Sequence, residues 1–224
     1  METILVTGAD RGIGAALVRQ YQSRGARAIA ACLGDGAEVA EAGIEVAPDI
    51  DVTSFPSLVA LRDRLDGTEI DILISNAGAF VPDKWREFDY EAMMRLYDIN
   101  ALGPLRVVDA LSPLLAPGSK VGIITSRVGS LADNASGGMY GYRMSKCAAN
   151  ALGVNLYHEL RPHGVAVMLL HPGQVATEMT RGLRGVGDFI TPELSAAGLI
   201  ERIDELGPAT PPEFRHTDGG LLPW

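Results

Sequence analysis

The chain has 224 residues, of which 47% are hydrophobic, enough to bury one substantial core in a single domain covering residues 1–224. Its formal net charge of -9 comes from acids scattered along the sequence without a block of Lys or Arg, which argues against nucleic acid or an anionic membrane as partner. The two cysteines lie in apolar surroundings typical of buried thiols, and no apolar stretch approaches the roughly 18 residues of a membrane span, so we expect a soluble cytoplasmic protein.

Short apolar runs alternate with helical patterns along the chain, an order typical of a parallel sheet joined by crossover helices. Strands are predicted at residues 3–6, 26–31, 43–47, 70–74, 120–125 and 165–170, with a weaker last strand near Phe214. Helices are predicted at residues 12–23, 55–65, 90–115, 139–160 and 192–206, with Pro and Gly at the joints. This pattern predicts a single-domain α/β fold with a Rossmann-type doubly wound parallel sheet of about seven strands flanked by helices.

The turn after the first strand reads Thr-Gly-Ala-Asp-Arg-Gly-Ile-Gly over residues 7–14. Glycines at a strand-to-helix turn permit a tight bend and let backbone N–H groups approach a pyrophosphate. Glycines also make ordinary turns, but this cluster has the preceding strand and following helix that dinucleotide binding requires. It lacks the Gly-Lys-Ser/Thr ending of nucleoside-triphosphate hydrolases, so the turn predicts a dinucleotide site.

Tyr142 and Lys146 stand four residues apart in Tyr-Arg-Met-Ser-Lys, so a helix brings a phenol and an ammonium onto one face. A nearby ammonium stabilises phenolate and lowers the pKa of a tyrosine from about 10, which suits a proton donor and acceptor. Chance also produces this spacing, with the ring in the core and the amine in water. Tyr140 has Met144 four residues on, so only Tyr142 has a lysine partner.

Further motifs lie at the ends of predicted strands and in the long helices. They are Asp51-Val52, Asn76-Ala77-Gly78, Asn100, Ser126, Pro172-Gly173 and Thr177. Together with the glycine turn and the Tyr142–Lys146 pair, they resemble the short-chain dehydrogenase/reductase family over nearly the whole chain. Within that family, residues 125–133 and the ending Leu222-Pro223-Trp224 look most similar to C-factor-like and sniffer-like carbonyl reductases.

The resemblance implies a catalytic role for four residues: Asn100, Ser126, Tyr142 and Lys146. Tyr142 then exchanges a proton with the substrate oxygen while hydride moves between cofactor and carbon, and Lys146 lowers the pKa of Tyr142. Ser126 holds the carbonyl oxygen, and Asn100 bends its helix and holds a water that relays protons. Ser130 competes with Ser126 because its distance to Tyr142 is nearer the usual separation, but Ser126 ends a strand at the edge where ligands bind.

The resemblance also implies the cofactor. Leu33 ends the second strand, at the position where an acidic residue selects NAD(H) and a basic residue selects NADP(H). A leucine selects neither cofactor. Arg11 resembles the basic residue that receives the 2'-phosphate, so NADP(H) is favoured, while Asp35 leaves NAD(H) open unless it caps its own loop. The implied cofactor contacts are Gly8, Asp10, Arg11, Gly12, Ile13, Gly14, Leu33, Asp51, Val52, Asn76, Ala77, Gly78, Tyr142, Lys146, Pro172, Gly173, Val175 and Thr177.

The regions expected around the substrate are mostly apolar, which favours a neutral ketone or aldehyde, with Arg181 and Arg184 as candidates to hold an anion instead. They offer Phe80, Val128, Leu131, Met139, Met179, Leu183 and Phe189. The resemblance implies a homodimer, with a tetramer possible, through the helices around Asn100 and Lys146. The alternative function is a weakly catalytic signalling or regulatory protein of C-factor type.

No metal site is predicted. His158, His163, His171 and His216 are far apart and lack ligand spacing or partner cysteines.

Overall fold

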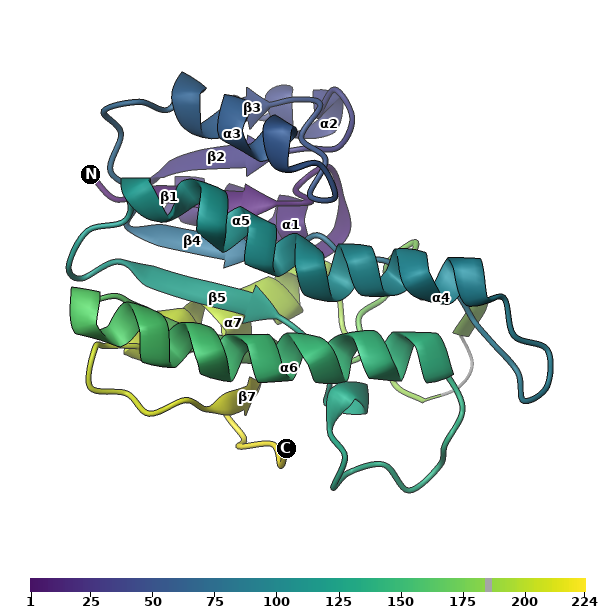
Figure 1. Cartoon of the computed structure of the whole chain (residues 1–224). Coiled ribbons are helices and arrows are strands. Elements are labelled where there is room, and N and C mark those ends of the chain that lie inside the picture. Colours follow the sequence, from purple (N-terminus) through teal and green to yellow (C-terminus); the bar gives the residue numbers. More distant parts are fainter. Residues whose placement is uncertain (184–186) are drawn as a thin grey trace.

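The computed structural model describes residues 1–183 and 187–224 and contains one parallel sheet in the order β3-β2-β1-β4-β5-β6-β7 (Figure 1). Its strands are β1 Thr3–Thr7, β2 Arg27–Ala31, β3 Glu45–Ala47, β4 Ile72–Ser75, β5 Lys120–Ile124, β6 Ala166–His171 and β7 Phe214–His216. The order reverses between β1 and β4, and ligands of doubly wound sheets bind at the carboxyl edge beside such a reversal. The predicted fold class is confirmed.

Helices cover both faces of the sheet (Figure 1). They are α1 Gly12–Ser23, α2 Ala37–Ala40, α3 Phe55–Arg64, α4 Tyr90–Tyr97, α5 Gly103–Leu111, α6 Tyr140–Leu160 and α7 Pro192–Glu205, with a π-helix at Asp98–Leu102 and 3-10 turns at Ser112–Leu114, Arg127–Gly129, Arg161–His163 and Arg181–Leu183. One core cluster joins α1 and α7 to one sheet face, and a second joins α3, α5 and α6 to the other.

Side chains of β1 explain why there are two layers. Ile4 and Val6 point into the cluster under α1 and α7, whereas Leu5 points into the opposite cluster. All three are fully buried, and burial of each such side chain contributes about 1.5–3 kcal/mol. Period-2 alternation along a strand with two apolar faces therefore requires a helix layer on each side.

The predicted helix at residues 90–115 is wrong as a continuous α-helix. α4 ends at Tyr97, a π-helical segment Asp98–Leu102 follows, and α5 then runs from Gly103. A π-helix is wider than an α-helix, and Asn100 lies in this widened segment. The buried side-chain amide of Asn100 forms hydrogen bonds to neighbouring chain segments. Helical periodicity in the sequence does not distinguish this local widening from a regular helix.

Two smaller features complete the comparison with the sequence. The four-residue helix α2 was not predicted, because it begins after the left-handed Gly36 and is shorter than a periodic pattern can reveal. Trp224 stacks on Phe214 with ring centroids 5.8 Å apart, so its indole packs against β7.

Candidate active site

The glycine turn forms a close-packed cradle between β1 and α1. Gly8 has φ +64°, and a Cβ there would lie 2.7 Å from the Cα of Ala77. A Cβ on Gly14 would lie 2.3 Å from the carbonyl oxygen of Gly8. Asn76 donates through Nδ2 to the carbonyls of Thr7 and Gly8, both at 3.0 Å, and so fixes the turn from the end of β4. No other residue fits at Gly8 or Gly14 without moving backbone.

The first turn of α1 lacks the usual protein cap. Its N-cap residue Arg11 has extended backbone and makes no side-chain cap hydrogen bond, and the first turn has no acid. By contrast, Ser54, Asp89 and Thr191 cap α3, α4 and α7 with their own side chains. A glycine cradle leading to free helix N–H groups fits the pyrophosphate of a dinucleotide.

Acids organise the loop after β2. Asp10 accepts hydrogen bonds from the backbone N–H groups of Leu33 and Gly34 at 3.0 and 2.9 Å, which ties this loop to the glycine turn. Asp35 accepts from the N–H of Ala37 at 3.1 Å at the start of α2, which is the capping role expected for it. Arg11 and Leu33 are both exposed here.

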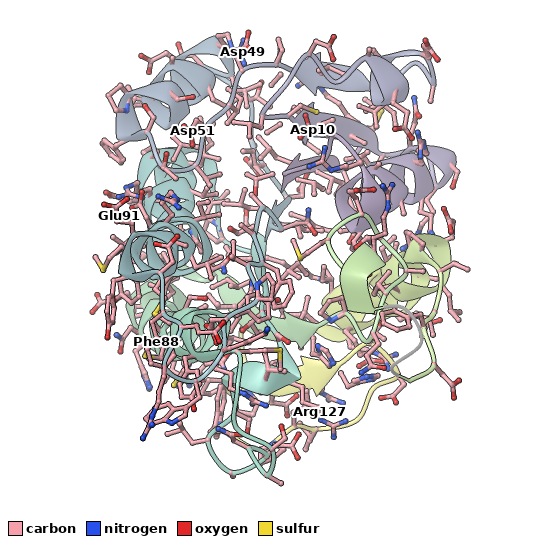
Figure 2. All side chains as sticks on the ribbon, turned by 90° about the vertical axis from the view of Figure 1, so that its right-hand side faces the viewer. Asp10, Asp49, Asp51, Phe88, Glu91 and Arg127 are labelled. Carbon is pink, nitrogen blue, oxygen red and sulfur yellow. The ribbon has the colours of Figure 1, made fainter. Side chains whose placement is uncertain are left out.

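The remaining predicted cofactor residues also lie at the carboxyl edge of the sheet. In Figure 2 the view is onto the carboxyl edge, with Asp10 and Asp51 in its upper half and Arg127 in its lower half. Asp51 accepts from the N–H and hydroxyl of Thr53, both at 2.8 Å, and Val52 beside it is buried. After β6, the Thr177 Cγ2 lies 3.3 Å from the position a Cβ would take on Gly12. The loop that follows Pro172, Gly173 and Val175 thus reaches the glycine turn.

Asn100 links the end of β4 to α6. Its Oδ1 accepts from the N–H of Ala79 at 2.8 Å, and its Nδ2 donates to the Ala79 carbonyl at 2.9 Å and to the Ser145 hydroxyl at 3.0 Å. Ser145 in turn donates to the carbonyl of Tyr142 at 2.8 Å. The side chain of Asn100 is completely buried, so it fixes two segments relative to one another.

Tyr142, Lys146 and Ser126 converge where β5 ends and α6 begins. The Nζ of Lys146 lies 5.9 Å from the centroid of the Tyr142 ring and donates to the carbonyl of Ile124 at 3.0 Å. Ser126 lies near enough to the Tyr142 hydroxyl to act on its pKa as a hydrogen-bond partner. Ser130 instead accepts from the N–H of Asp133 within its own loop. Ser126 is therefore the better placed of the two serines.

The expected lowering of the Tyr142 pKa by Lys146 is wrong for this geometry. Burial raises the pKa of Tyr142 to about 12, and the hydrogen bond from Ser126 opposes this change. Burial also lowers the pKa of Lys146 to about 8. Loss of water around each group therefore sets both shifts, and the phenol keeps its proton at neutral pH.

Two polar residues near Tyr142 were missed from the sequence. Ser145 is fully buried next to Lys146, and its spacing of four residues from Gly141 and from Ala149, which are also buried, was the signal. Asp83 accepts hydrogen bonds from the N–H groups of Tyr140 and Gly141 at the start of α6. Nothing in the local sequence links Asp83 to α6, because the two are far apart along the chain.

The predicted substrate-lining residues divide into two groups. Phe80 contacts the Tyr142 ring edge-on, with centroids 5.1 Å apart, so it belongs to the site. Val128 and Leu131 instead line a cavity of about 440 Å³ with Met144 and Cys147 on another side of α6. Tyr142 does not line that cavity, so a place for Val128 and Leu131 beside the substrate stays a prediction.

The segment after β6 carries the other predicted lining residues. Met179 is exposed, and Arg181 pairs with Glu178. The side chain of Leu183 and all of residues 184–186, which include Arg184, lie outside the described structure. Cys32 and Cys147 are both free thiols, as expected, but only Cys32 is buried and Cys147 is partly exposed.

Comparison with known proteins identifies the family. The model of the family described as short chain dehydrogenase matches residues 2–185. The chain belongs to this family. It is an oxidoreductase of the nicotinamide-dependent short-chain dehydrogenase/reductase type.

Two curated relatives of this short-chain dehydrogenase cover most of the chain. The 1-hydroxy-2-glutathionyl-2-methyl-3-butene dehydrogenase of a Rhodococcus species is 52% identical over 226 residues and covers 100% of both chains. The C-signal protein of Myxococcus xanthus is 43% identical over 161 residues, which cover 69% of this chain and 93% of the relative. The latter confirms the expected similarity to C-factor-like members.

Solved structures give the same result. A short-chain dehydrogenase/reductase from Burkholderia multivorans with bound NADP superposes with a TM-score of 0.90 at 30% identity, over 100% of this chain and 99% of the other. The carbonyl reductase Sniffer of D. melanogaster superposes with a TM-score of 0.89 at 25% identity, over 100% of both chains. The sniffer-like resemblance is thereby confirmed. Among residues 1–183 and 187–224, no helix is both long and apolar enough to span a membrane.

Proposed function

We propose that this short-chain dehydrogenase transfers hydride between NADP(H) and a carbonyl–alcohol pair, with Tyr142 as the general acid and base. The observation that carries this proposal is the meeting of Tyr142, Ser126 and Lys146 at the sheet edge. The glycine cradle and the uncapped start of α1 lie at the same edge. A bound nicotinamide supplies or accepts the hydride in this chemistry.

In the reducing direction, the hydroxyl of Tyr142 donates its proton to the carbonyl oxygen of the substrate. Because burial raises the pKa of Tyr142 to about 12, this group is protonated before reaction. Ser126 donates a hydrogen bond to the same oxygen and stabilises the negative charge that develops there. The ammonium of Lys146 then stabilises the phenolate left on Tyr142, and oxidation reverses the proton transfer.

For the adenosine end of the cofactor, we favour NADP(H). Arg11 is exposed beside the glycine turn, and its guanidinium matches the geometry of a phosphate group. Asp35, the residue that would favour NAD(H), is engaged at the start of α2. Comparison of kcat/KM for NADPH and NADH tests this choice, and R11A should reduce the NADPH preference by about tenfold, as expected for loss of about 1.4 kcal/mol. A clear preference of the unsubstituted chain for NADH would overturn it.

A neutral ketone or aldehyde is the proposed substrate, because Phe80 gives the site an aromatic wall at Tyr142. The Rhodococcus relative supports a second candidate, since its name describes an alcohol that carries a glutathionyl group and its identity to this chain is 52%. A panel of simple ketones, aldehydes and glutathione-thioether alcohols, followed by NADPH absorbance in both directions, separates the two by their kcat/KM values. No turnover of any compound would favour the alternative, a weakly catalytic regulatory protein of C-factor type.

A homodimer is also part of the proposal, with a tetramer as the larger possibility. Large apolar side chains are exposed along α4, α5 and α6, namely Tyr90, Met94, Tyr97, Leu105 and Met144. Val107, Val108 and Leu111 of α5 are buried against the chain's own sheet and are not available to a partner. Size-exclusion chromatography with light scattering tests the dimer, and a monomer at micromolar concentration would contradict it. The two free thiols support a reducing, cytoplasmic location.

A further inference from the structure

The helix that carries Tyr142 begins without a cap from its own sequence. Its N-cap residue Met139 is left-handed at φ 49° and makes no side-chain cap hydrogen bond. Gly137 and Gly138 before it are also left-handed, at φ 64° and 68°. A non-glycine residue in this region is strained, so local sequence alone does not favour starting α6 here.

Asp83 supplies the missing cap from the loop after β4. Its Oδ1 accepts from the N–H of Tyr140 and its Oδ2 from the N–H of Gly141, both at 2.8 Å. These are charge-assisted bonds, and a carboxylate at a helix N-terminus also interacts favourably with the helix dipole. Tyr142 is the next residue along the helix, so the cap lies within one turn of the proposed acid.

The same loop contacts Tyr142 and its neighbour through aromatic rings. Phe80 meets the Tyr142 ring edge-on at 5.1 Å, while Phe88 and Trp85 lie 5.1 and 5.9 Å from the ring of Tyr140. At the base of the loop, Asn100 binds both backbone groups of Ala79. Residues 79–88, named here the capping loop, are therefore joined to the start of α6 by hydrogen bonds and by ring contacts.

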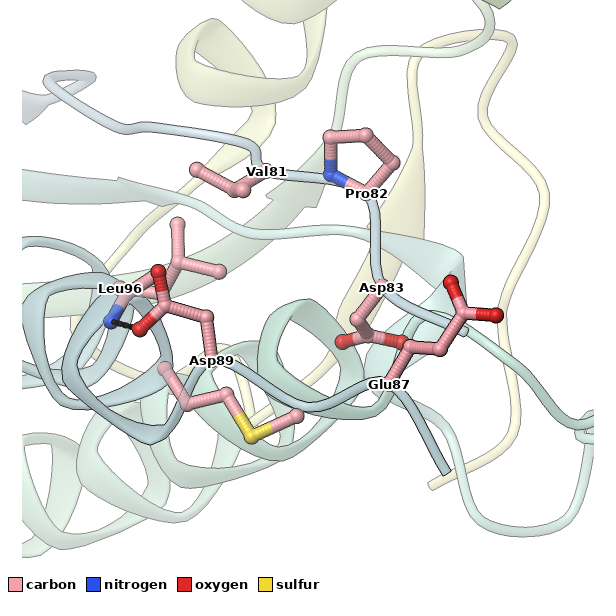
Figure 3. Close-up of a pocket in the computed structure, with 8 residues that line it drawn as sticks. Val81, Pro82, Asp83, Glu87, Asp89 and Leu96 are labelled. Carbon is pink, nitrogen blue, oxygen red and sulfur yellow. Dashed lines mark hydrogen bonds between the residues drawn. The ribbon is translucent and has the colours of Figure 1, made fainter. Parts of the chain in front are cut away.

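A second aspartate in the same small pocket offers a contrast. Figure 3 shows Asp83 and Asp89 lining this pocket, together with Glu87. Asp89 caps its own helix, α4, by accepting from the N–H of Ala92 at 2.9 Å. Both aspartates cap a helix, but only the helix held by Asp83 carries Tyr142 and Lys146.

We propose that Asp83 is a positioning residue for proton transfer: by capping α6 from the capping loop, it fixes the Tyr142 hydroxyl relative to Ser126 and the substrate oxygen. This inference rests on the proposed function of Tyr142. A reacting group displaced by about 1 Å can cost on the order of 100-fold in rate, so a frayed first turn of α6 should be felt in kcat.

The test compares D83A and D83N with D89A in the full chain. In D83A we expect kcat to fall by about 10- to 100-fold, while the KM for NADPH changes by less than about twofold. The amide of D83N keeps one acceptor oxygen, so its kcat should fall by an intermediate amount. If D83A does not fold, D83N provides the test in its place. D89A should keep kcat within about twofold, because it removes a cap of similar strength from a helix without the acid.

Hydrogen exchange without cofactor gives a second readout. In D83A and D83N the amides of Tyr140 and Gly141 should exchange faster than in the unsubstituted chain, whereas in D89A the change should centre on Ala92. Unchanged kcat in D83A and D83N would overturn the inference, as would an equal loss of kcat in D89A. Absence of turnover in the unsubstituted chain overturns instead the proposed function, and with it the catalytic meaning of the cap.

Discussion

Helices α1 and α6 both begin at the carboxyl edge of the sheet, and neither is capped by its own N-cap side chain. At α1 the first turn contains no acid, and the N-cap residue Arg11 makes no side-chain cap hydrogen bond. At α6 the first N–H groups are bound by Asp83. A helix start that receives an anionic ligand is left open, whereas one that must hold a reacting side chain in place is closed by the protein itself.

The largest effect should come from removing the acid at α6. Y142F deletes the hydroxyl that exchanges the proton, so kcat should fall by about 10²- to 10⁴-fold. Cofactor affinity, measured by the quenching of tryptophan fluorescence on NADPH addition, should stay within about threefold. Y140F is the matched control, because no lysine lies one helical turn after Tyr140. Activity retained in Y142F would remove Tyr142 from the mechanism.

Substitution of the two serines tests whether Ser126, and not Ser130, acts together with Tyr142. S126A should lower kcat by about 10²-fold, because a hydrogen-bond donor to a developing oxyanion contributes at least about 2.7 kcal/mol. S130A should leave kcat within about twofold, since that hydroxyl accepts from Asp133 N–H away from Tyr142. Steady-state kinetics on the best carbonyl substrate distinguish them. Equal losses in the two variants would mean that the serine assignment is wrong.

At α1 the expected defect is in binding rather than in chemistry. G14A places a Cβ 2.3 Å from the carbonyl of Gly8, so the cradle must open. We expect the KM for NADPH to rise at least about tenfold, equivalent to about 1.4 kcal/mol, with a smaller change in kcat. G207A, where a Cβ meets no atom within 4 Å, is the control. A G14A variant that binds NADPH normally would contradict a phosphate site at this turn.

The smallest effect concerns the stability of the buried lysine. Burial lowers the pKa of Lys146 from 10.5 to about 8, so below pH 8 the folded chain holds a costly buried ammonium. Between about pH 8 and 10.5 the unfolded chain binds more protons at this residue, and its contribution to stability therefore rises with pH. K146M should be inactive yet about 2–3 kcal/mol more stable at pH 7, a gap that narrows by pH 9.5.

Urea unfolding of K146M and the unsubstituted chain at these two pH values measures the gap. Both pH values lie below 10, where the unfolded tyrosines begin to ionise and Tyr142 would add an opposite change. A stability difference that does not depend on pH would mean that Lys146 is not an unpaired buried charge. The catalytic role proposed for Lys146 would then not come at a cost in folding stability.

Much of the fold and of the site was predictable because it depends on local spacing. All seven strands lie where apolar runs predict them, and α1 has the predicted bounds. The glycine turn, the four-residue spacing of Tyr142 and Lys146, and the position of Ser126 after a strand are equally local. Parallel strands bring their carboxyl ends to one edge, so these residues had to meet once the strand order was known.

The sequence by itself determined which groups are present and on which element each one lies, since strand and helix periods are properties of short segments. Only the tertiary structure decided that Asp83 caps a helix 57 residues away and that a π-helix carries Asn100. It also reversed the expected direction of the Tyr142 pKa. Desolvation and long-range hydrogen bonds depend on which segments meet in space, and no local spacing encodes that meeting.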